Sequence, residues 1–164
     1  MGMRRLGRMM ELDKDRLIAG LKKITPTPAL DEDAVGVRHD GLCLEPAQLT
    51  ACATLLLEHG FHLVFITAVH VSPALEVVYQ FAHYESTCRI HLRAATAEGR
   101  SVPSIAGIYQ GAAWHEREIY DFFGIEFEGH PGLKPIILTG EEKGLHPLLH
   151  PEQNLKKRED IFTT

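Results

Sequence analysis

Charged side chains gather in an aromatic-rich stretch, Ala113 to Asp121 (AWHEREIYD), which contains Glu116, Arg117 and Glu118. Two carboxylates can share general acid–base chemistry if both reach one substrate. The residues around them predict a helix, and on a helix Glu116 and Glu118 project about 200° apart. They do not converge on one substrate, and the pattern therefore does not predict acid–base catalysis.

Helical spacing places Glu116 on the side of this helix that faces the protein core. Apolar residues recur around it at steps of three and four: Ile105, Ile108, Ala112, Ile119 and Phe123. Burying an unpaired carboxylate costs several kcal/mol. The sequence therefore predicts that Glu116 has a partner, either an arginine or a row of backbone N–H groups.

A second face of the same helix mixes aromatic and charged side chains. It comprises Trp114, Arg117, Glu118, Asp121 and Phe122, with Arg117 and Asp121 one turn apart. Such a mixture is typical of the anchors of protein interfaces. It also fits a lattice of exposed ion pairs, which contributes little stability. The residues alone leave both interpretations open.

Histidines and cysteines do not form a recognisable metal or redox motif. The chain has ten histidines, but Pro147 separates His146 from His150, so these two do not share a helix face. The three cysteines form no CxxC pair, which argues against a zinc ribbon or an iron–sulfur cluster held by this chain. We expect no metal site. A small thiol or metal enzyme that uses Cys43 or a histidine pair is the less favoured alternative.

The composition limits the classes of protein to which the chain can belong. The chain has 164 residues, is 45% hydrophobic and carries a formal net charge of −5, which fits one folded domain and argues against a nucleic-acid partner. Its longest apolar stretch, about Leu63 to Val71, is far shorter than the roughly 20 residues of a membrane-spanning helix. The basic N-terminus lacks the apolar region of a signal peptide. We expect neither a membrane span nor secretion, and a reducing compartment.

Helices are predicted over residues 13–24, 46–60 and 103–123, and a short hairpin over residues 34–44. The hairpin turn falls at Asp40-Gly41, which tolerates the positive φ angles of a two-residue turn. Cys52 lies on the apolar stripe of the second helix and is expected to be a packing thiol.

Strands are predicted over residues 61–71, 75–84 and 87–94. The first is apolar on both faces, which is typical of a central strand. The other two join through a tight reversal at Glu85-Ser86, in which Tyr84 faces Thr87. This register puts Cys88 on the inner face, as a second packing thiol. It turns the opposite face toward solvent or a partner, with Arg89, His91 and Arg93.

Residues 125–164 combine four prolines with many apolar side chains. The prolines forbid a regular helix, and the apolar side chains are too many for a solvated linker. The stretch should therefore lie along its own sheet or, in our preferred interpretation, along another protein. We accordingly predict a core domain over residues 10–124 and an extended, proline-containing C-terminal arm over residues 125–164 that packs on a partner subunit.

Residues 113–138 (AWHEREIYDFFGIEFEGHPGLKPIIL) resemble the signature of the 30 kDa subunit, also known as the C subunit, of NADH–quinone oxidoreductase, respiratory complex I. Each position of that signature is filled, in order, by Glu116-Arg117-Glu118, Asp121, Phe122-Phe123, His130, Lys134 and Ile136-Ile137. Pro103-Ser104 and the order of helices and strands also agree with the family, so the resemblance covers roughly residues 10–150.

The resemblance implies an α+β fold of two layers, with a mixed, mostly antiparallel sheet, helices on one face and an extended C-terminal arm. It implies a non-catalytic assembly subunit in the peripheral arm of a proton-pumping translocase, on the cytoplasmic side of the cell inner membrane. Flavin, iron–sulfur clusters and quinone would lie in partner subunits and no cofactor in this chain. The large D subunit, which is 49 kDa-like, would be its partner, together with other subunits of the peripheral arm.

The resemblance also assigns roles to individual residues. Four charged residues would fix the last helix against its surroundings: Glu116, Arg117, Glu118 and Asp121. Three others would mark the surface that faces the partner: Trp114, His130 and Lys134.

The sequence departs from the family after the signature. Residues 145–151 (LHPLLHP) keep the family's His-Pro-Leu but lose the basic and acidic residues that usually follow, and the chain is short for the family. These departures leave open a second kind of complex to which the chain could belong. In that alternative, the chain is the equivalent subunit of a membrane-bound nickel-iron hydrogenase complex.

Overall fold

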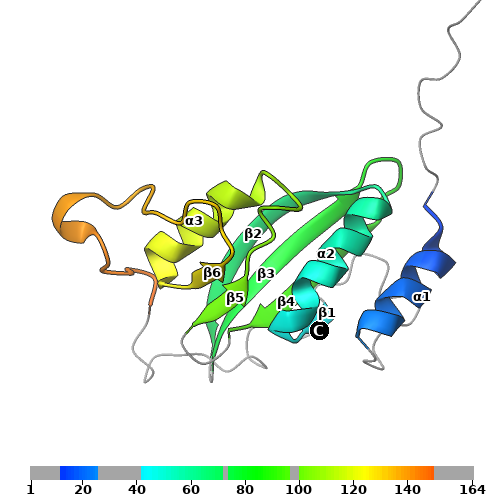
Figure 1. The fold of residues 1–164 in the computed structure, drawn as a ribbon, viewed down its shortest axis with the longest axis horizontal. Coiled ribbons are helices and arrows are strands. Elements are labelled where there is room, and N and C mark those ends of the chain that lie inside the picture. Colours follow the sequence, from blue (N-terminus) through cyan, green and yellow to red (C-terminus); the bar gives the residue numbers. More distant parts are fainter. Residues whose placement is uncertain (1–11, 26–41, 72–73, 97–99, 150–164) are drawn as a thin grey trace, which may run out of the picture.

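The computed structural model describes residues 12–25, 42–71, 74–96 and 100–149 (Figure 1). The elements in chain order are α1 (Lys14–Ile24), β1 (Leu42–Leu44), a 3-10 turn (Pro46–Gln48), α2 (Leu49–Glu58), β2 (Phe61–Val71), β3 (Ala74–His83), β4 (Arg89–Ala95), β5 (Ser101–Pro103), α3 (Ala112–Phe123), β6 (Glu126–Glu128) and a second 3-10 turn (Gly140–Glu142).

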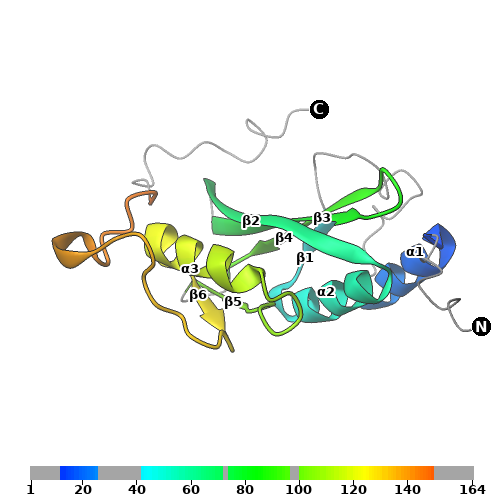
Figure 2. The same cartoon turned by 90° about the horizontal axis from the view of Figure 1, so that it is seen from above.

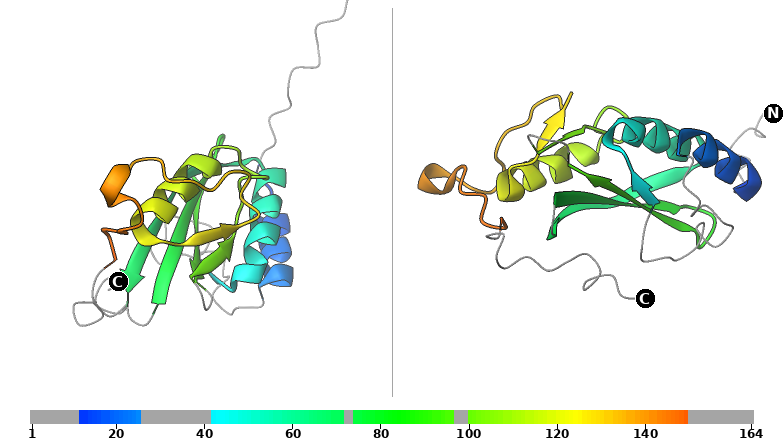
Figure 3. Two further views of the ribbon diagram at one scale, coloured as in Figure 1. Left: turned by 60° about the vertical axis from the view of Figure 1, so that its left-hand side comes forward. Right: turned by 90° about the horizontal axis from the view of Figure 1, so that it is seen from below.

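The strands form a mixed sheet of four in the order β1-β4-β3-β2, and β5 and β6 pair separately in parallel. Within the larger sheet β1 runs parallel to β4, whereas β4, β3 and β2 are antiparallel neighbours. The three helices lie on one side of this sheet (Figure 2). Two further views show the same two layers (Figure 3). The predicted α+β class, with its mixed and mostly antiparallel sheet, is confirmed.

Local chemistry explains the first two helices. Asp13 caps α1 by accepting a hydrogen bond from the Arg16 N–H at 3.0 Å. The α1 side chains that face inward, Leu17, Ile18 and Leu21, are buried, as the spacing predicted. In the second predicted helix, Pro46 lies in a 3-10 turn and the α-helix begins only at Leu49.

The register of β3 and β4 is confirmed, since Val77 pairs with Ala94 and Ala82 with Arg89. One detail of the outer face was wrong. Arg93 is only 3% exposed, and its guanidinium Nη2 contacts the Glu76 carboxylate at 2.5 Å. The Glu76 carboxylate on the adjacent strand β3 pairs with this buried cation.

The predicted position of β2 was wrong. Among the described residues it pairs with β3 alone and lies at the edge of the sheet, although its sequence is that of a central strand. Apolar residues on both faces of a strand indicate that the faces are covered. They do not show how many strands are hydrogen-bonded to it.

The predicted hairpin is described only in part. Leu42–Leu44 forms β1, which pairs with β4 and supplies the parallel component of the sheet. The rest of the hairpin, including the turn at Asp40-Gly41, lies outside the described residues.

The last predicted helix was too long at its start, because α3 begins at Ala112 rather than Pro103. Residues 101–103 form β5 instead. Gly107 and Gly111 disfavour a helix between them. The N–H of Ile105 is also bound to a side chain of α3, so it is held in place by a contact from outside its own segment.

The burial of the thiols gives a testable expectation. Cys52 is fully buried in α2, and burial raises the pKa of its thiol to about 11, whereas Cys43 on β1 is exposed. At pH 8 iodoacetamide should alkylate Cys43 at least about tenfold faster than Cys52 in the native chain, because the thiolate is the reactive form. Peptide mass spectrometry after timed labelling measures both rates. Alkylation in urea provides the control, since both cysteines should then react alike; equal rates in the native chain would contradict the buried position of Cys52.

Candidate functional site

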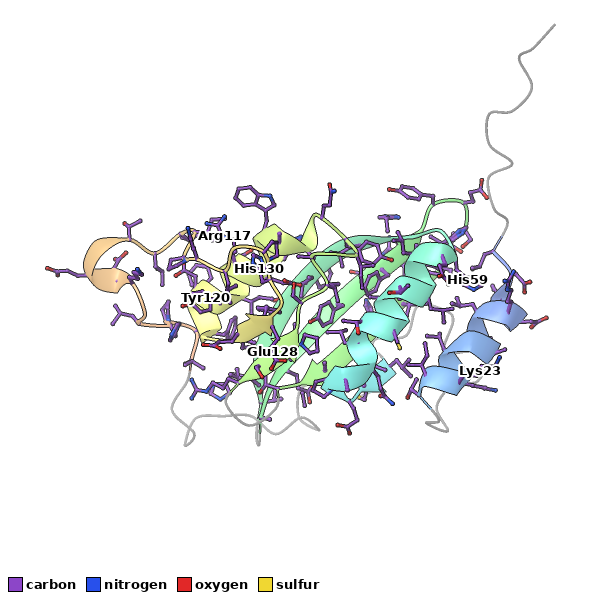
Figure 4. All side chains as sticks on the ribbon, viewed as in Figure 1. Lys23, His59, Arg117, Tyr120, Glu128 and His130 are labelled. Atoms are coloured by element: carbon purple, nitrogen blue, oxygen red, sulfur yellow. The ribbon has the colours of Figure 1, made fainter. Side chains whose placement is uncertain are left out.

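The side chains of the predicted site lie on α3 and on the segment that follows it (Figure 4). Glu116, on the core-facing side of α3, is fully buried. Its Oε2 accepts a hydrogen bond from the Ser104 hydroxyl at 2.6 Å, and its Oε1 accepts one from the Ile105 N–H at 2.8 Å. The predicted burial is confirmed, but the partners are a single backbone N–H and a hydroxyl instead of an arginine or a row of N–H groups.

Burial has the largest effect on the pKa of the Glu116 carboxyl. Loss of solvent raises the pKa of its carboxyl, and the bonds from Ser104 and Ile105 only partly offset that rise. The neighbouring Tyr79 was not predicted as part of this cluster. Its hydroxyl is buried and has no hydrogen-bond partner in the described part of the chain. Burial, and then the charge of Glu116, raise the pKa of Tyr79 well above its ordinary value.

His130 joins the segment after β6 to the start of α3. Its Nδ1 accepts a hydrogen bond from the Gly132 N–H at 2.9 Å, so in the neutral ring the hydrogen is on Nε2. That Nε2 donates to the Ala113 carbonyl at 3.1 Å and lies 4.0 Å from Glu116 Oε2. The imidazole is 2% exposed. The structure therefore places the His130 ring among these groups and not on the surface.

Arg117 binds the backbone of the segment that follows β6. Its Nε donates to the Lys134 carbonyl at 3.0 Å and its Nη2 to the Pro135 carbonyl at 3.1 Å. The guanidinium also lies 5.3 Å from the centre of the exposed Trp114 ring. Lys134 contributes its carbonyl to this contact, and the residue is exposed.

Asp121, one turn further along α3, binds the next part of the same segment. Its Oδ2 accepts hydrogen bonds from the N–H groups of Ile136, Ile137 and Leu138 at 3.1, 2.8 and 2.8 Å. Burial opposes ionisation, but the three N–H groups together outweigh it and lower the pKa of the Asp121 carboxyl. Arg117 and Asp121 thus each bind backbone groups of one segment, an arrangement that neither sequence-based interpretation foresaw.

The end of α3 is closed by residues much further along the chain. His146 Nδ1 donates to the Asp121 carbonyl at 3.0 Å, and the Leu148 N–H donates to the Phe122 carbonyl at 3.1 Å. Gly124 ends the helix with φ +66°, and a Cβ there would lie 2.9 Å from the His146 ring. A distant segment therefore satisfies the last carbonyls of α3. From the sequence His146 was considered as a metal ligand and as part of the family's His-Pro-Leu run, and its role as a helix cap was missed.

We call residues 134–148 the anchored loop, because α3 binds it near both ends. In Figures 1 and 2 it projects beyond the end of α3 (orange). It carries three of the large exposed apolar side chains of the described residues: Ile137, Leu145 and Leu148. Trp114 is exposed on the first turns of α3. Glu118, also exposed, has no hydrogen-bond partner within the described residues, and nothing there explains its place in the signature.

The charged side chains of this site hold different segments of the chain together. The two buried carboxylates, Glu116 and Asp121, accept hydrogen bonds from different segments of the chain. Among the residues that the structure describes, no three His, Cys, Asp or Glu side chains are arranged to hold a metal ion. In the same part of the chain no helix has the length and apolarity needed to cross a membrane.

Replacing Glu116 tests the first cluster. Glu116→Ala leaves the Ile105 N–H and the Ser104 hydroxyl without their acceptor and should lower the free energy of unfolding by about 3 kcal/mol. Glu116→Gln should cost less and change the pH dependence. The pKa of Glu116 is higher in the folded than in the unfolded chain, so the wild type loses stability as the pH rises through the folded pKa. The Gln variant does not ionise, so its stability relative to the wild type should increase as the pH rises. Urea unfolding at several pH values measures both effects; a constant difference between Gln variant and wild type would contradict the burial of a titrating carboxyl.

Replacing Asp121 tests the anchoring of the loop. Asp121→Ala removes the acceptor of three N–H groups and should cost about 3 kcal/mol at pH 7. Asp121→Asn, which keeps one oxygen, is the matched variant and should cost about half as much. Because the folded pKa is lowered, this stabilisation is present above the unfolded pKa and disappears as the pH falls through the folded pKa. Limited proteolysis should also cut the anchored loop faster in the Ala variant, and an unchanged cleavage rate would argue against the anchoring.

Comparisons with known proteins show which family this chain resembles. The family described as "Respiratory-chain NADH dehydrogenase, 30 Kd subunit" matches residues 42–157. The chain is similar to the C subunit of NADH-quinone oxidoreductase from Jannaschia sp. (strain CCS1), with 43% identity over 89 residues, covering 52% of this chain and 42% of that one. It is also similar to the protein of the same name from Xanthobacter autotrophicus, with 38% identity over 114 residues, covering 65% and 54%. The chain thus spans about half the length of the curated relatives it matches.

A solved structure supports the same relationship. A chain of the membrane-bound sulfane sulfur reductase, described as an archaeal respiratory membrane complex, is similar with a TM-score of 0.59 and 27% identity. The likeness covers 77% of this chain and 79% of that chain. The matched residues 42–157 include α3, with its two carboxylates, and the whole anchored loop. The chain belongs to the family of the 30 kDa subunit of respiratory-chain NADH dehydrogenase.

Proposed function

We propose that this chain is a non-catalytic assembly subunit of a respiratory NADH–quinone oxidoreductase, and that it docks to the large, 49 kDa-like D subunit through Trp114 and the anchored loop. One observation carries the proposal. The backbone of the loop is held by buried and half-buried groups of α3, while its apolar side chains face outward. A rigid loop that displays apolar side chains is suited to protein binding, since little conformational entropy is lost on docking.

The names of the relatives support this function. Two of them are named as C subunits of NADH-quinone oxidoreductase. A further relative, from Bdellovibrio bacteriovorus, is named as a combined C/D subunit and is 42% identical over 73 residues, which cover 44% of this chain and 13% of that protein. Its name places C and D in one polypeptide, as expected for two subunits that lie side by side.

The proposal includes the place of the chain in the cell. As part of the peripheral arm it would lie on the cytoplasmic side of the inner membrane, attached through other subunits of a proton-pumping complex. Flavin, iron–sulfur clusters and quinone would be bound by those subunits. Residues 125–164 would act as the arm toward the partner, with the anchored loop as its first part.

One observation also supports a role in a second kind of respiratory complex. The likeness to a chain of the membrane-bound sulfane sulfur reductase shows that this fold occurs in a respiratory complex of another name. The likeness supports a membrane-bound complex other than NADH–quinone oxidoreductase, and within that class our alternative proposal is the equivalent subunit of a nickel-iron hydrogenase complex. The large subunit recovered with the chain distinguishes the two, because nickel-binding cysteine pairs would be present only in the hydrogenase.

Affinity purification of the tagged full chain from native membranes tests the docking surface. Ile137→Ser combined with Leu145→Ser should reduce recovery of the large subunit at least about tenfold, because apolar anchors dominate interface energy. Leu57→Ser is the matched control, since Leu57 is exposed to a similar degree, 47% against 53% for Ile137, but lies on α2.

Replacing Arg117 provides an independent variant. Arg117→Ala removes two hydrogen bonds to the anchored loop without changing its exposed side chains, and it should weaken recovery of the large subunit while the chain still folds. Thermal unfolding checks the fold, and quantitative mass spectrometry measures the recovered partner. Full recovery with both the Arg117 variant and the double serine variant would contradict the docking surface.

A further inference from the structure

His130 joins the two parts of the proposed docking surface (Figure 4). Its Nε2 donates a hydrogen bond to the Ala113 carbonyl, next to Trp114 in the first turn of α3. Its Nδ1 accepts a hydrogen bond from the Gly132 N–H, two residues before the anchored loop begins at Lys134. One buried ring therefore links the backbone beside the exposed tryptophan to the turn that leads into the loop.

The hydrogen bond from Gly132 requires a neutral ring. A ring nitrogen that accepts a hydrogen bond carries no hydrogen, whereas both nitrogens of a protonated imidazole carry one. Protonation of His130 would set its Nδ1–H against the Gly132 N–H, now at 2.9 Å, and that bond would be lost. The bond from Nε2 to the Ala113 carbonyl would remain, because Nε2 donates in both states. Protonation therefore releases the side of the ring that faces the loop.

Glu116 offers the protonated ring a new partner. Its Oε2 lies 4.0 Å from His130 Nε2. Burial raises the pKa of the Glu116 carboxyl and the positive charge of a protonated His130 lowers it, so the two side chains attract each other when both are charged. The ring can thus exchange its bond from Gly132 for an ion pair with Glu116 without leaving its place.

The other charged or titratable groups near the ring come from α3, β3 and β6. Arg117, on α3, is bound to carbonyls of the anchored loop. The Tyr79 hydroxyl, on β3, is buried near Glu116. Glu128, on β6, precedes His130 by two residues and is exposed. Within the described part of the chain, Glu116 alone makes an ionic contact with the ring, so it is the group that responds to a charge on His130.

Two other histidines allow a comparison. His146, in the anchored loop, donates its Nδ1–H to the Asp121 carbonyl, and a protonated ring would still donate there. His83, at the end of β3, accepts a hydrogen bond at Nδ1 from the Glu85 N–H at 3.2 Å, also two residues further along the chain. His83 therefore has the same local contact as His130, but at the turn between β3 and β4.

We propose that His130 is a positioning residue of the docking surface in its neutral form, and that protonation of its ring releases the turn at residues 130–132 and weakens binding of the large subunit. The inference rests on the proposed function and adds a pH dependence to it. Histidine is the side chain that ordinarily changes its charge between about pH 5 and 8, so mild acidification is the signal to which such a contact responds.

Nitrogen NMR of the full chain tests the release of the turn. The ring nitrogens report the protonation of His130, and the amide signal of Gly132 reports its hydrogen bond. As the pH falls, both signals should change with the same midpoint. Exchange of the Gly132 amide, corrected for the intrinsic pH dependence, should become at least about tenfold faster, as expected when one hydrogen bond is lost. A Gly132 amide that keeps its shift and its exchange rate while the ring protonates would overturn the proposal.

Two uncharged variants imitate the two states of the ring. His130→Asn keeps an acceptor for the N–H two residues further on, as in an Asx turn, so its recovery of the large subunit should not depend on pH through that midpoint. The longer amide of His130→Gln can reach the Ala113 carbonyl but does not close the turn. Its recovery at pH 8 should already be about fivefold below that of the wild type, which corresponds to about 1 kcal/mol for the lost bond.

His83→Asn is the matched control, since it makes the same change at the other histidine turn and should keep the pH dependence of the wild type. Quantitative mass spectrometry of the tagged full chain, purified from native membranes at a series of pH values, measures the recovery of the large subunit. Thermal unfolding of each variant at the same pH values checks that the chain is folded.

The outcomes separate this inference from the proposed function. If the wild type recovers the large subunit equally above and below the midpoint, or if His130→Asn loses it on acidification as the wild type does, the role of His130 is wrong and the proposed function stands. If the wild type recovers no large subunit at pH 8, the proposed function is wrong. The effect on docking then falls with it, and the NMR titration still decides whether the protonated ring releases the turn.

Discussion

A carboxylate enclosed by protein must receive its hydrogen bonds from the protein, and α3 contains two of them. Glu116 obtains them from Ser104 and Ile105, in the turn before the helix. Asp121 obtains them from residues 136–138, beyond β6. Since each unsatisfied buried group would cost on the order of 1–3 kcal/mol, both neighbouring segments have to stay where they are. The two acids of one short helix therefore fix the chain on both sides of it.

This constraint explains how a segment with little regular structure can hold its shape. Residues 129–149 include three prolines and only one short 3-10 turn, so few of their backbone groups are paired by a helix or a sheet. Side chains of α3 supply the missing partners, with Arg117 binding carbonyls and Asp121 binding N–H groups. The loop also binds the helix, because the His146 side chain and the Leu148 N–H donate hydrogen bonds to carbonyls at the end of α3. Helix and loop each complete the other's hydrogen bonding.

How far the sequence predicts this molecule depends on the kind of signal. Periodicity identified the helices, the register of β3 and β4, and the burial of Glu116, because each of these follows from local spacing. It placed the end of the last helix at Gly124 correctly, but it did not identify the contacts of Ser104, Tyr79 and His146 with α3, because these join distant segments. The excess length assigned to α3 has the same origin, since Ile105 is held by Glu116 and not by helical bonds. The family signature marked most of the residues involved but could not say that they bind backbone groups of their own chain.

The misplacement of β2 has a different cause. Hydrophobic patterning reports which surfaces are covered in the functional state, and for a protein that works inside an assembly that state includes its neighbours. Among the described residues β2 lies at the edge of the sheet, but α3 packs against it, so an apolar sequence is expected there without a second neighbouring strand. The exposed apolar side chains of the anchored loop follow the same logic at the opposite end of α3 from Tyr109 and the start of β2. An apolar strand sequence therefore indicates that the strand is covered, by a helix as well as by another strand, and does not fix its place in the sheet.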